Sequence, residues 1–149
     1  MLSDNTTRGF AAVLPAFLGR LALGWYFVLA GWGKVTNEVS NGLGSFYRGS
    51  GFQDRNPAWL PEIIATPYGY ALPWAELIGG ALLLLGLFTR VGAGLVALML
   101  FTIGIALLNA GDLLPRHHVL VFFPLALLLW QAGADRLTVD ALIRRRRVV

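Results

Sequence analysis

The sequence contains no cysteine, and only 13% of its residues carry a formal charge. Without cysteine, the chain can form no disulfides, perform no thiol redox chemistry and bind no metal through cysteine. Soluble proteins have roughly 25% charged residues. A chain of 149 residues that is 56% hydrophobic therefore has too little polar surface to cover a water-soluble globule. The composition indicates a membrane protein with no room for a separate soluble domain.

Four long apolar runs account for most of the chain. About 20 apolar residues, each rising ~1.5 Å along a helix, cross the ~30 Å hydrocarbon layer. We expect an all-α, four-transmembrane-helix bundle that forms one domain over residues 1–149, with spans at about 11–33, 69–88, 91–110 and 117–133. One long outer loop, residues 35–66, joins the first two spans. It is either an amphipathic cap on the membrane surface or a lid over an opening in the bundle.

The distribution of lysine and arginine predicts the orientation of these spans, because cytoplasmic flanks carry an excess of both. One side would hold Arg8, Arg90, Arg136 and the run Arg144–Arg147, against Lys34, Arg48, Arg55 and Arg116 on the other. We therefore predict that both termini are cytoplasmic. In the basic tail 144–149, we expect Arg144, Arg145, Arg146 and Arg147 to contact anionic lipid headgroups. Nucleic-acid binding is disfavoured because no folded reading surface accompanies this run.

Arg20 and Glu76 are the ionisable residues that this assignment places within the hydrocarbon. A charge there costs ~2.5–3.5 kcal/mol and normally faces a partner inside the bundle. Arg20 and Lys34 share one helical face with two glycines, and Glu76 shares another with Gly80, so both faces predict packing seams. Lys34 lies in the outer half with Glu76, whereas Arg20 is about 21 Å below Lys34 along the helix. Glu76 could pair with Lys34, with Arg20 if the helices tilt, or with both through a buried water.

Two interpretations of these charges remain open. In the structural interpretation, the charges fix the register of the helices. In the functional one, they belong to a polar pocket in the outer half, with Glu76 as the catalytic, proton-exchanging group. The candidate binding and electrostatic residues are Arg20, Lys34, Trp74, Asn109, His117 and His118. Such a pocket would suit a quinone headgroup, which needs donors for two carbonyls and a carboxylate or histidine that exchanges protons.

The sequence shows no pattern for haem, flavin, an iron–sulfur cluster or a metal. His117 and His118 would point about 100° apart on a helix, and the chain has no other histidine. Haem held by two histidines is therefore disfavoured. The Gly79-Gly80 step fits helix packing, and no nucleotide-binding or nucleophile-elbow motif occurs. We expect no metal and no covalently bound cofactor, and quinone is the one cofactor considered.

Three segments carry a pattern that can be compared with known families. They are Arg20-Leu-Ala-Leu-Gly24 with Phe27, Ala30-Gly31 and Lys34; Glu76-Leu-Ile-Gly-Gly80-Ala-Leu-Leu-Leu-Leu-Gly86-Leu-Phe-Thr-Arg90; and the tail Gly133-Ala-Asp135-Arg-Leu-Thr-Val-Asp140. Together they resemble the DoxX family of small bacterial four-helix membrane proteins. The resemblance implies a multi-pass protein of the bacterial inner membrane.

The resemblance also implies a redox context. Relatives are associated with a quinol oxidase of thermoacidophilic archaea, with thiosulfate:quinone oxidoreductase and with a bacterial complex that handles oxidative stress. The chain is then expected to be a subunit of a quinone-linked oxidoreductase or respiratory complex. The alternative is a non-catalytic accessory subunit packed against a larger respiratory or photosynthetic complex. Whether the chain is itself an enzyme stays open, and thiol-linked activity has no basis without cysteine.

Overall fold

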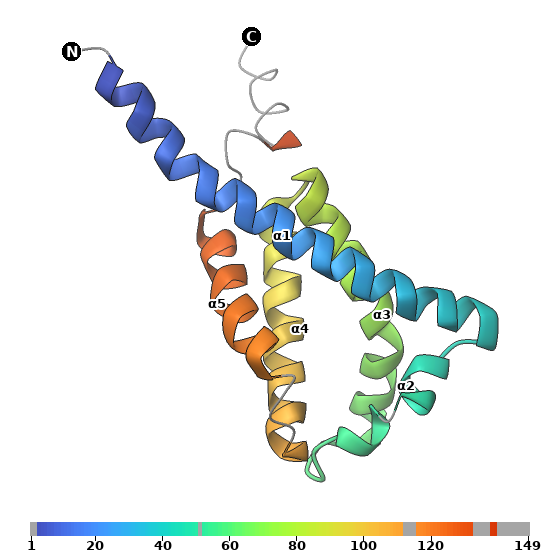
Figure 1. Ribbon diagram of the computed structural model, residues 1–149. Helices are drawn as coiled ribbons and strands as arrows, with labels where there is room; N and C mark the ends of the chain where they lie inside the picture. The colour runs from blue at the N-terminus through green and yellow to red at the C-terminus, as the bar shows by residue number, and fades with distance from the viewer. Residues whose placement is uncertain (1–2, 51, 112–115, 133–137, 140–149) are drawn as a thin grey trace.

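Every regular element that the structure describes is a helix. The computed structural model describes residues 3–50, 52–111, 116–132 and 138–139 (Figure 1). Its elements are α1 (Ser3–Asn41), α2 (Ser45–Gly49), the 3-10 helix η1 (Gln53–Arg55), α3 (Glu62–Leu85), α4 (Thr89–Ala110) and α5 (Arg116–Ala132). The expectation of an all-α protein is confirmed for these residues.

Three of the described helices are long and apolar enough to cross a membrane. They are the segments Val13–Asn41 of α1, Glu62–Leu85 of α3 and Thr89–Asn109 of α4. The 17 residues of α5 extend about 26 Å, slightly less than the hydrocarbon thickness. Crossing by α5, the predicted fourth span at 117–133, stays a prediction. The basic tail 144–149, with its run of four arginines, lies outside the described residues.

The first helix is longer, and the connection after it shorter, than the hydropathy pattern predicts. α1 continues past residue 33 because Val35 and Glu38 in its last turns are buried. The Glu38 carboxylate accepts hydrogen bonds from the backbone N–H groups of Gly44 and Phe46, which folds the connection back onto α1. Gly42, with φ 92°, ends the helix in the left-handed region. Residues 42–61 therefore carry α2 and η1, where a long loop over 35–66 was expected.

α3 and α4 form a helical hairpin with a turn of three residues. α3 begins at Glu62, earlier than the predicted residue 69, and ends at Leu85. Gly86 follows it with a φ of 64°, the left-handed conformation typical of a helix C-terminus. The N–H of Leu87 donates to the carbonyl of Leu82 at 3.0 Å, which closes the turn. Phe88, at φ 47°, is the one non-glycine residue with positive φ in the described chain. The short turn fixes α3 and α4 as antiparallel neighbours.

α1 runs obliquely across the bundle and touches α3 backbone to backbone (Figure 1). A Cβ added to Gly31 would lie 2.5 Å from the backbone nitrogen of Leu77, and one added to Gly24 would lie 2.8 Å from that of Leu84. Small residues allow such close approach between helices in a membrane. Gly24 lies beside Leu84 and Gly31 beside Leu77, so the two helices are antiparallel and their register is fixed.

The adjacent glycines of α3 serve two different interfaces. A Cβ on Gly80 would lie 2.6 Å from the backbone nitrogen of Val28 on α1. A Cβ on Gly79 would meet the Val96 side chain of α4 at 3.2 Å. Successive residues of a helix point about 100° apart, so this pair lets α1 and α4 both pack closely on α3. The packing role expected for Gly79-Gly80 agrees with these contacts.

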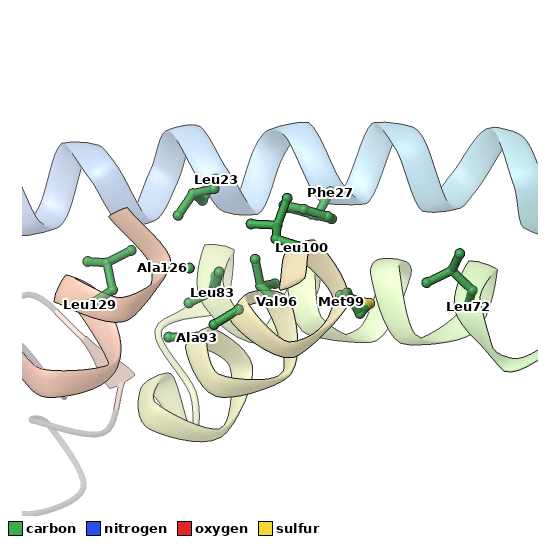
Figure 2. Packing of buried hydrophobic residues seen from close by; sticks show 11 residues of the cluster. Leu23, Phe27, Leu72, Leu83, Ala93, Val96, Met99, Leu100, Ala126 and Leu129 are labelled. Atoms are coloured by element: carbon green, nitrogen blue, oxygen red, sulfur yellow. The ribbon is translucent and has the colours of Figure 1, made fainter. Parts of the chain in front are cut away.

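The apolar core lies where the four long helices meet. In Figure 2, Leu23 and Phe27 project from α1 toward the side chains of the other three helices. The labelled members from those helices are Leu72, Leu83, Ala93, Val96, Met99, Leu100, Ala126 and Leu129. Since α1 contributes to this core along the middle of its length, it is an integral part of the bundle.

Replacing Gly31 by alanine should destabilise the protein, whereas the same change at Gly33 should not. At Gly31 the new methyl group would press on the α3 backbone, and overpacking of this kind costs about 1–3 kcal/mol. At Gly33 nothing lies within 4 Å, so alanine should stabilise the helix by about 0.5–1 kcal/mol. Thermal unfolding of both variants in one detergent measures the two shifts. Equal shifts for the two variants would contradict the backbone contact between α1 and α3.

Candidate functional site

A buried ion pair joins α1 to α3 near the end of the bundle that carries residues 42–61. The Lys34 Nζ atom lies 2.6 Å from both carboxylate oxygens of Glu76. The Glu76 side chain is 3% exposed and that of Lys34 is 25% exposed. The Phe46 ring covers the ammonium, with its centroid 4.8 Å from Nζ, a distance at which an aromatic face attracts a cation. The pair is therefore enclosed by the connection as well as by the two helices.

The register of α1 on α3 determines which cation reaches Glu76. Gly31 lies beside Leu77, the residue that follows Glu76 on α3. Lys34 lies one turn after Gly31 on α1, and its side chain reaches Glu76. Arg20 lies eleven residues before Gly31, about 16 Å away along the axis. The sequence left open whether Glu76 pairs with Lys34, with Arg20 or with both. In the structure Glu76 pairs with Lys34.

Arg20 is buried at the opposite end of the α1–α3 contact. One of its guanidinium nitrogens donates to the carbonyls of Leu83 and Leu84, at 2.6 and 3.1 Å. These carbonyls lie in the last turn of α3, where a helix runs out of backbone donors. The same nitrogen lies close to Gly86, which Thr138 also contacts from beyond α5. Arg20 therefore stabilises the end of α3, far from Glu76.

A cavity of about 230 Å³ lies beside the ion pair. Its polar lining residues are Tyr26, Lys34, Arg55, Glu76 and His118. The rest of its described lining is apolar and includes three phenylalanines, from α1 and from the connection. A hydrophobic chamber with a few convergent polar groups is the usual form of a small-molecule site. The cavity is smaller than the ~300–1,000 Å³ of pockets for drug-sized ligands, so a single ring system matches its size.

Three of the predicted site residues meet at this cavity, namely Lys34, Glu76 and His118. Trp74 and Asn109 do not line it, and both side chains are exposed. Each lies two residues from a lining residue on its own helix, which turns it about 200° away. The helical position of His117 is described, but its side chain lies outside the described part of the chain.

Aromatic contacts between α1 and α5 hold His118 at the cavity. The Tyr26 ring stacks on the imidazole, with centroids 5.9 Å apart and planes at 25°. Phe122, one turn along α5, contacts the Tyr26 ring at 4.8 Å. Because His118 is exposed as well as lining the cavity, it lies between the cavity and the protein surface. The sequence analysis did not select Tyr26 as a site residue, because its aromatic ring equally fits a packed wall.

The connection between α1 and α3 forms one side of the cavity. Phe46, Phe52 and Arg55 all line it, although the chain here has no helical or alternating pattern that would predict which side chains point inward. The Phe46 and Phe52 rings lie 6.0 Å apart. The two alternatives for this segment, a lid over an opening in the bundle and an amphipathic cap on the membrane surface, both stay predictions.

Among the described residues, the site gathers hydrogen-bonding groups and no cluster that would hold a metal. No three histidine, cysteine, aspartate or glutamate residues gather within the described ranges. The cavity instead combines one carboxylate and one imidazole with an ammonium, a guanidinium and a phenol. These groups can donate hydrogen bonds to carbonyl oxygens and exchange protons with a bound molecule.

The match to a family model covers most of this architecture. The DoxX model matches residues 16–109. This chain belongs to the DoxX family. The matched region of this DoxX protein includes the α1–α3 contact, the ion pair and the connection that closes the cavity. Comparisons with curated proteins and with solved structures give no match.

Replacing Lys34 by methionine should destabilise the protein strongly. Removing one member of a buried ion pair leaves the other charge uncompensated and costs about 3–5 kcal/mol. The double variant Lys34→Met with Glu76→Gln should recover a large part of this loss, since no isolated charge remains. Unfolding of the two single variants and the double variant gives the coupling energy. If the double variant loses as much stability as both single changes added together, the two side chains do not act as a pair.

Proposed function

We propose that this DoxX protein is a subunit of a quinone-linked membrane oxidoreductase or respiratory complex, and that the cavity beside Lys34 and Glu76 binds the quinone headgroup. The observation that carries this proposal is the meeting of a buried ion pair, an imidazole and a phenol in one largely apolar chamber. A quinone headgroup is a flat ring with two carbonyls. It therefore needs apolar contact on its faces and hydrogen-bond donors at its edges.

The lining residues fit the two requirements separately. Phe27, Phe46 and Phe52 offer apolar surface to the ring. Lys34 and His118 provide donors toward carbonyl oxygens, and Glu76 accepts and releases protons. A quinone bound here would accept electrons and protons, and the electrons would come from a partner chain. In this proposal the DoxX protein contributes binding and proton exchange.

The charge distribution favours one orientation in the membrane. We infer a location in the bacterial inner membrane, with both termini cytoplasmic, because basic residues gather in the short flanks on that side. The cavity then opens in the outer half of the bundle. Fusing a reporter that is active only in the cytoplasm to either terminus tests this orientation.

A second candidate function is that of a non-catalytic accessory subunit packed against a larger respiratory or photosynthetic complex. The observation in its favour is a stripe of exposed large side chains along α1, formed by Leu18, Trp25 and Trp32 at seven-residue spacing. A partner helix could pack on this stripe. Lipid chains cover such a stripe equally well, so isolation of the protein with its partners has to decide.

The replacement of Glu76 by glutamine should weaken binding of the reduced ligand, a tailless benzoquinol, about 10- to 100-fold. A quinol hydroxyl can donate to the Glu76 carboxylate, and a hydrogen bond to a charged group contributes ~1.5–3 kcal/mol, which corresponds to that range. The measurement is the binding of the tailless benzoquinol to the purified protein in lipid nanodiscs. Mass spectrometry of the native preparation records whether quinone or partner chains co-purify.

A cavity-filling pair of variants controls for effects on folding. Phenylalanine at Ala30, which lines the cavity, should abolish binding, whereas phenylalanine at the exposed neighbour Leu29 should not. Unchanged binding in both Glu76→Gln and Ala30→Phe would exclude the cavity as the quinone site. Co-purification of partner chains without quinone, together with the absence of binding, would favour the accessory role.

A further inference from the structure

We propose that a second, apolar pocket next to the cavity holds the isoprenoid tail of the quinone, so that the ligand is a quinone that carries a hydrocarbon chain. This inference rests on the proposed function, because it assigns the tail of a ligand whose headgroup lies beside Glu76. The pocket has a volume of about 160 Å³ and lies between the connection, α3 and α4. Its walls include Leu60, Ile64 and Ile105.

Three polar side chains in the wall of this pocket, those of Tyr68, Thr102 and Asn56, form hydrogen bonds with each other or with the surrounding structure. The Tyr68 and Thr102 hydroxyls share a hydrogen bond, and the Thr102 hydroxyl also lies 2.8 Å from the carbonyl of Met99. The side-chain amide of Asn56 donates to the Tyr47 hydroxyl at 2.5 Å. The surface that remains for an occupant is mainly hydrocarbon, which suits an isoprenoid chain and not a polar metabolite.

The pocket and the headgroup cavity share two lining residues. Phe52 of the connection and Ala106 of α4 line both spaces. A ligand with its ring in the cavity therefore has an apolar space on the other side of these two residues. Ala106 is small, and the Phe52 ring is the larger part of this shared wall. In this proposal the tail passes from the cavity into the pocket at this shared wall.

The outer rim of the pocket is exposed on the surface of the bundle. Trp59 and Ile64 both line the pocket and are 69% and 56% exposed. Ile64 belongs to α3, one of the candidate spans. A tail could therefore enter sideways from the lipid and remain in apolar surroundings throughout. A hydrocarbon chain gains little free energy by leaving lipid for an equally apolar pocket. The role of the pocket is thus to give space to a tail that is covalently attached to the headgroup.

If the pocket gives space to the tail, filling it should weaken binding of a quinone with a tail and not binding of a quinone without one. Tryptophan at Ile105 or at Ile64 should weaken binding of a benzoquinone with two isoprene units by about tenfold or more, which corresponds to at least ~1.4 kcal/mol. The same substitutions should leave the ring-matched tailless benzoquinone within about twofold of wild type. Binding is measured in nanodiscs, with free ligand expressed as its concentration in the lipid. Tryptophan at Ile63, which is 83% exposed and does not line the pocket, is the matched control.

The two ligands separate failure of this inference from failure of the proposed function. If wild-type protein binds the tailless quinone but neither Ile105→Trp nor Ile64→Trp affects the tailed one, the tail lies elsewhere and the inference is wrong. It is also wrong if both ligands weaken equally, since the substitutions then disturb the headgroup cavity. If a lipid acyl chain co-purifies in the pocket and the tailed quinone does not displace it, the pocket is a lipid site. If wild-type protein binds neither quinone, the proposed function itself fails.

Discussion

The direct backbone contact between α1 and α3 determines the arrangement of the charged groups. Gly24 and Gly31 allow α1 to lie on the α3 backbone, and the antiparallel register of these contacts places Lys34 and Arg20. Lys34 meets the carboxylate of Glu76 at one end, and Arg20 meets backbone carbonyls at the other. A shift of one helical turn, about 5.4 Å, would separate both interactions. Tight packing and charge pairing therefore specify the same register.

Much of the membrane-spanning part could be predicted from the sequence, because apolar length and the exclusion of charge are local properties. The extension of α1 to Asn41 could not, since its last turns are stabilised by burial of Val35 and Glu38 against the connection. The position of Arg20 was also missed. From the sequence, a charged side chain can be matched with another charged side chain of suitable depth. The partner of Arg20 is instead a backbone carbonyl at the end of α3, that of Leu83, and no sequence pattern marks such a carbonyl.

The candidate site could be predicted only in part, because some of its residues lie on long helices with a regular sequence pattern and others lie in the connection, which has no such pattern. Lys34 and Glu76 lie on helical faces whose periodicity makes them visible in the sequence. Arg55 and Phe52 lie in the connection, and only the tertiary fold brings them to the cavity. The cavity thus combines a rigid wall from the helices with a wall from the connection, which carries the side chain shared with the apolar pocket.

The separation of interacting residues along the chain also bears on the biogenesis of the protein. During synthesis, α1 emerges before any part of α3, and the partners of Lys34 and Arg20 follow 42 and 63 residues later. An apolar segment that carries both Arg20 and Lys34 is costly to hold alone in hydrocarbon. Nascent α1 should therefore remain near the headgroups or against the insertion machinery until the α3–α4 hairpin arrives. The last step of insertion is then the docking of α1, which brings its cations into the membrane together with their partners.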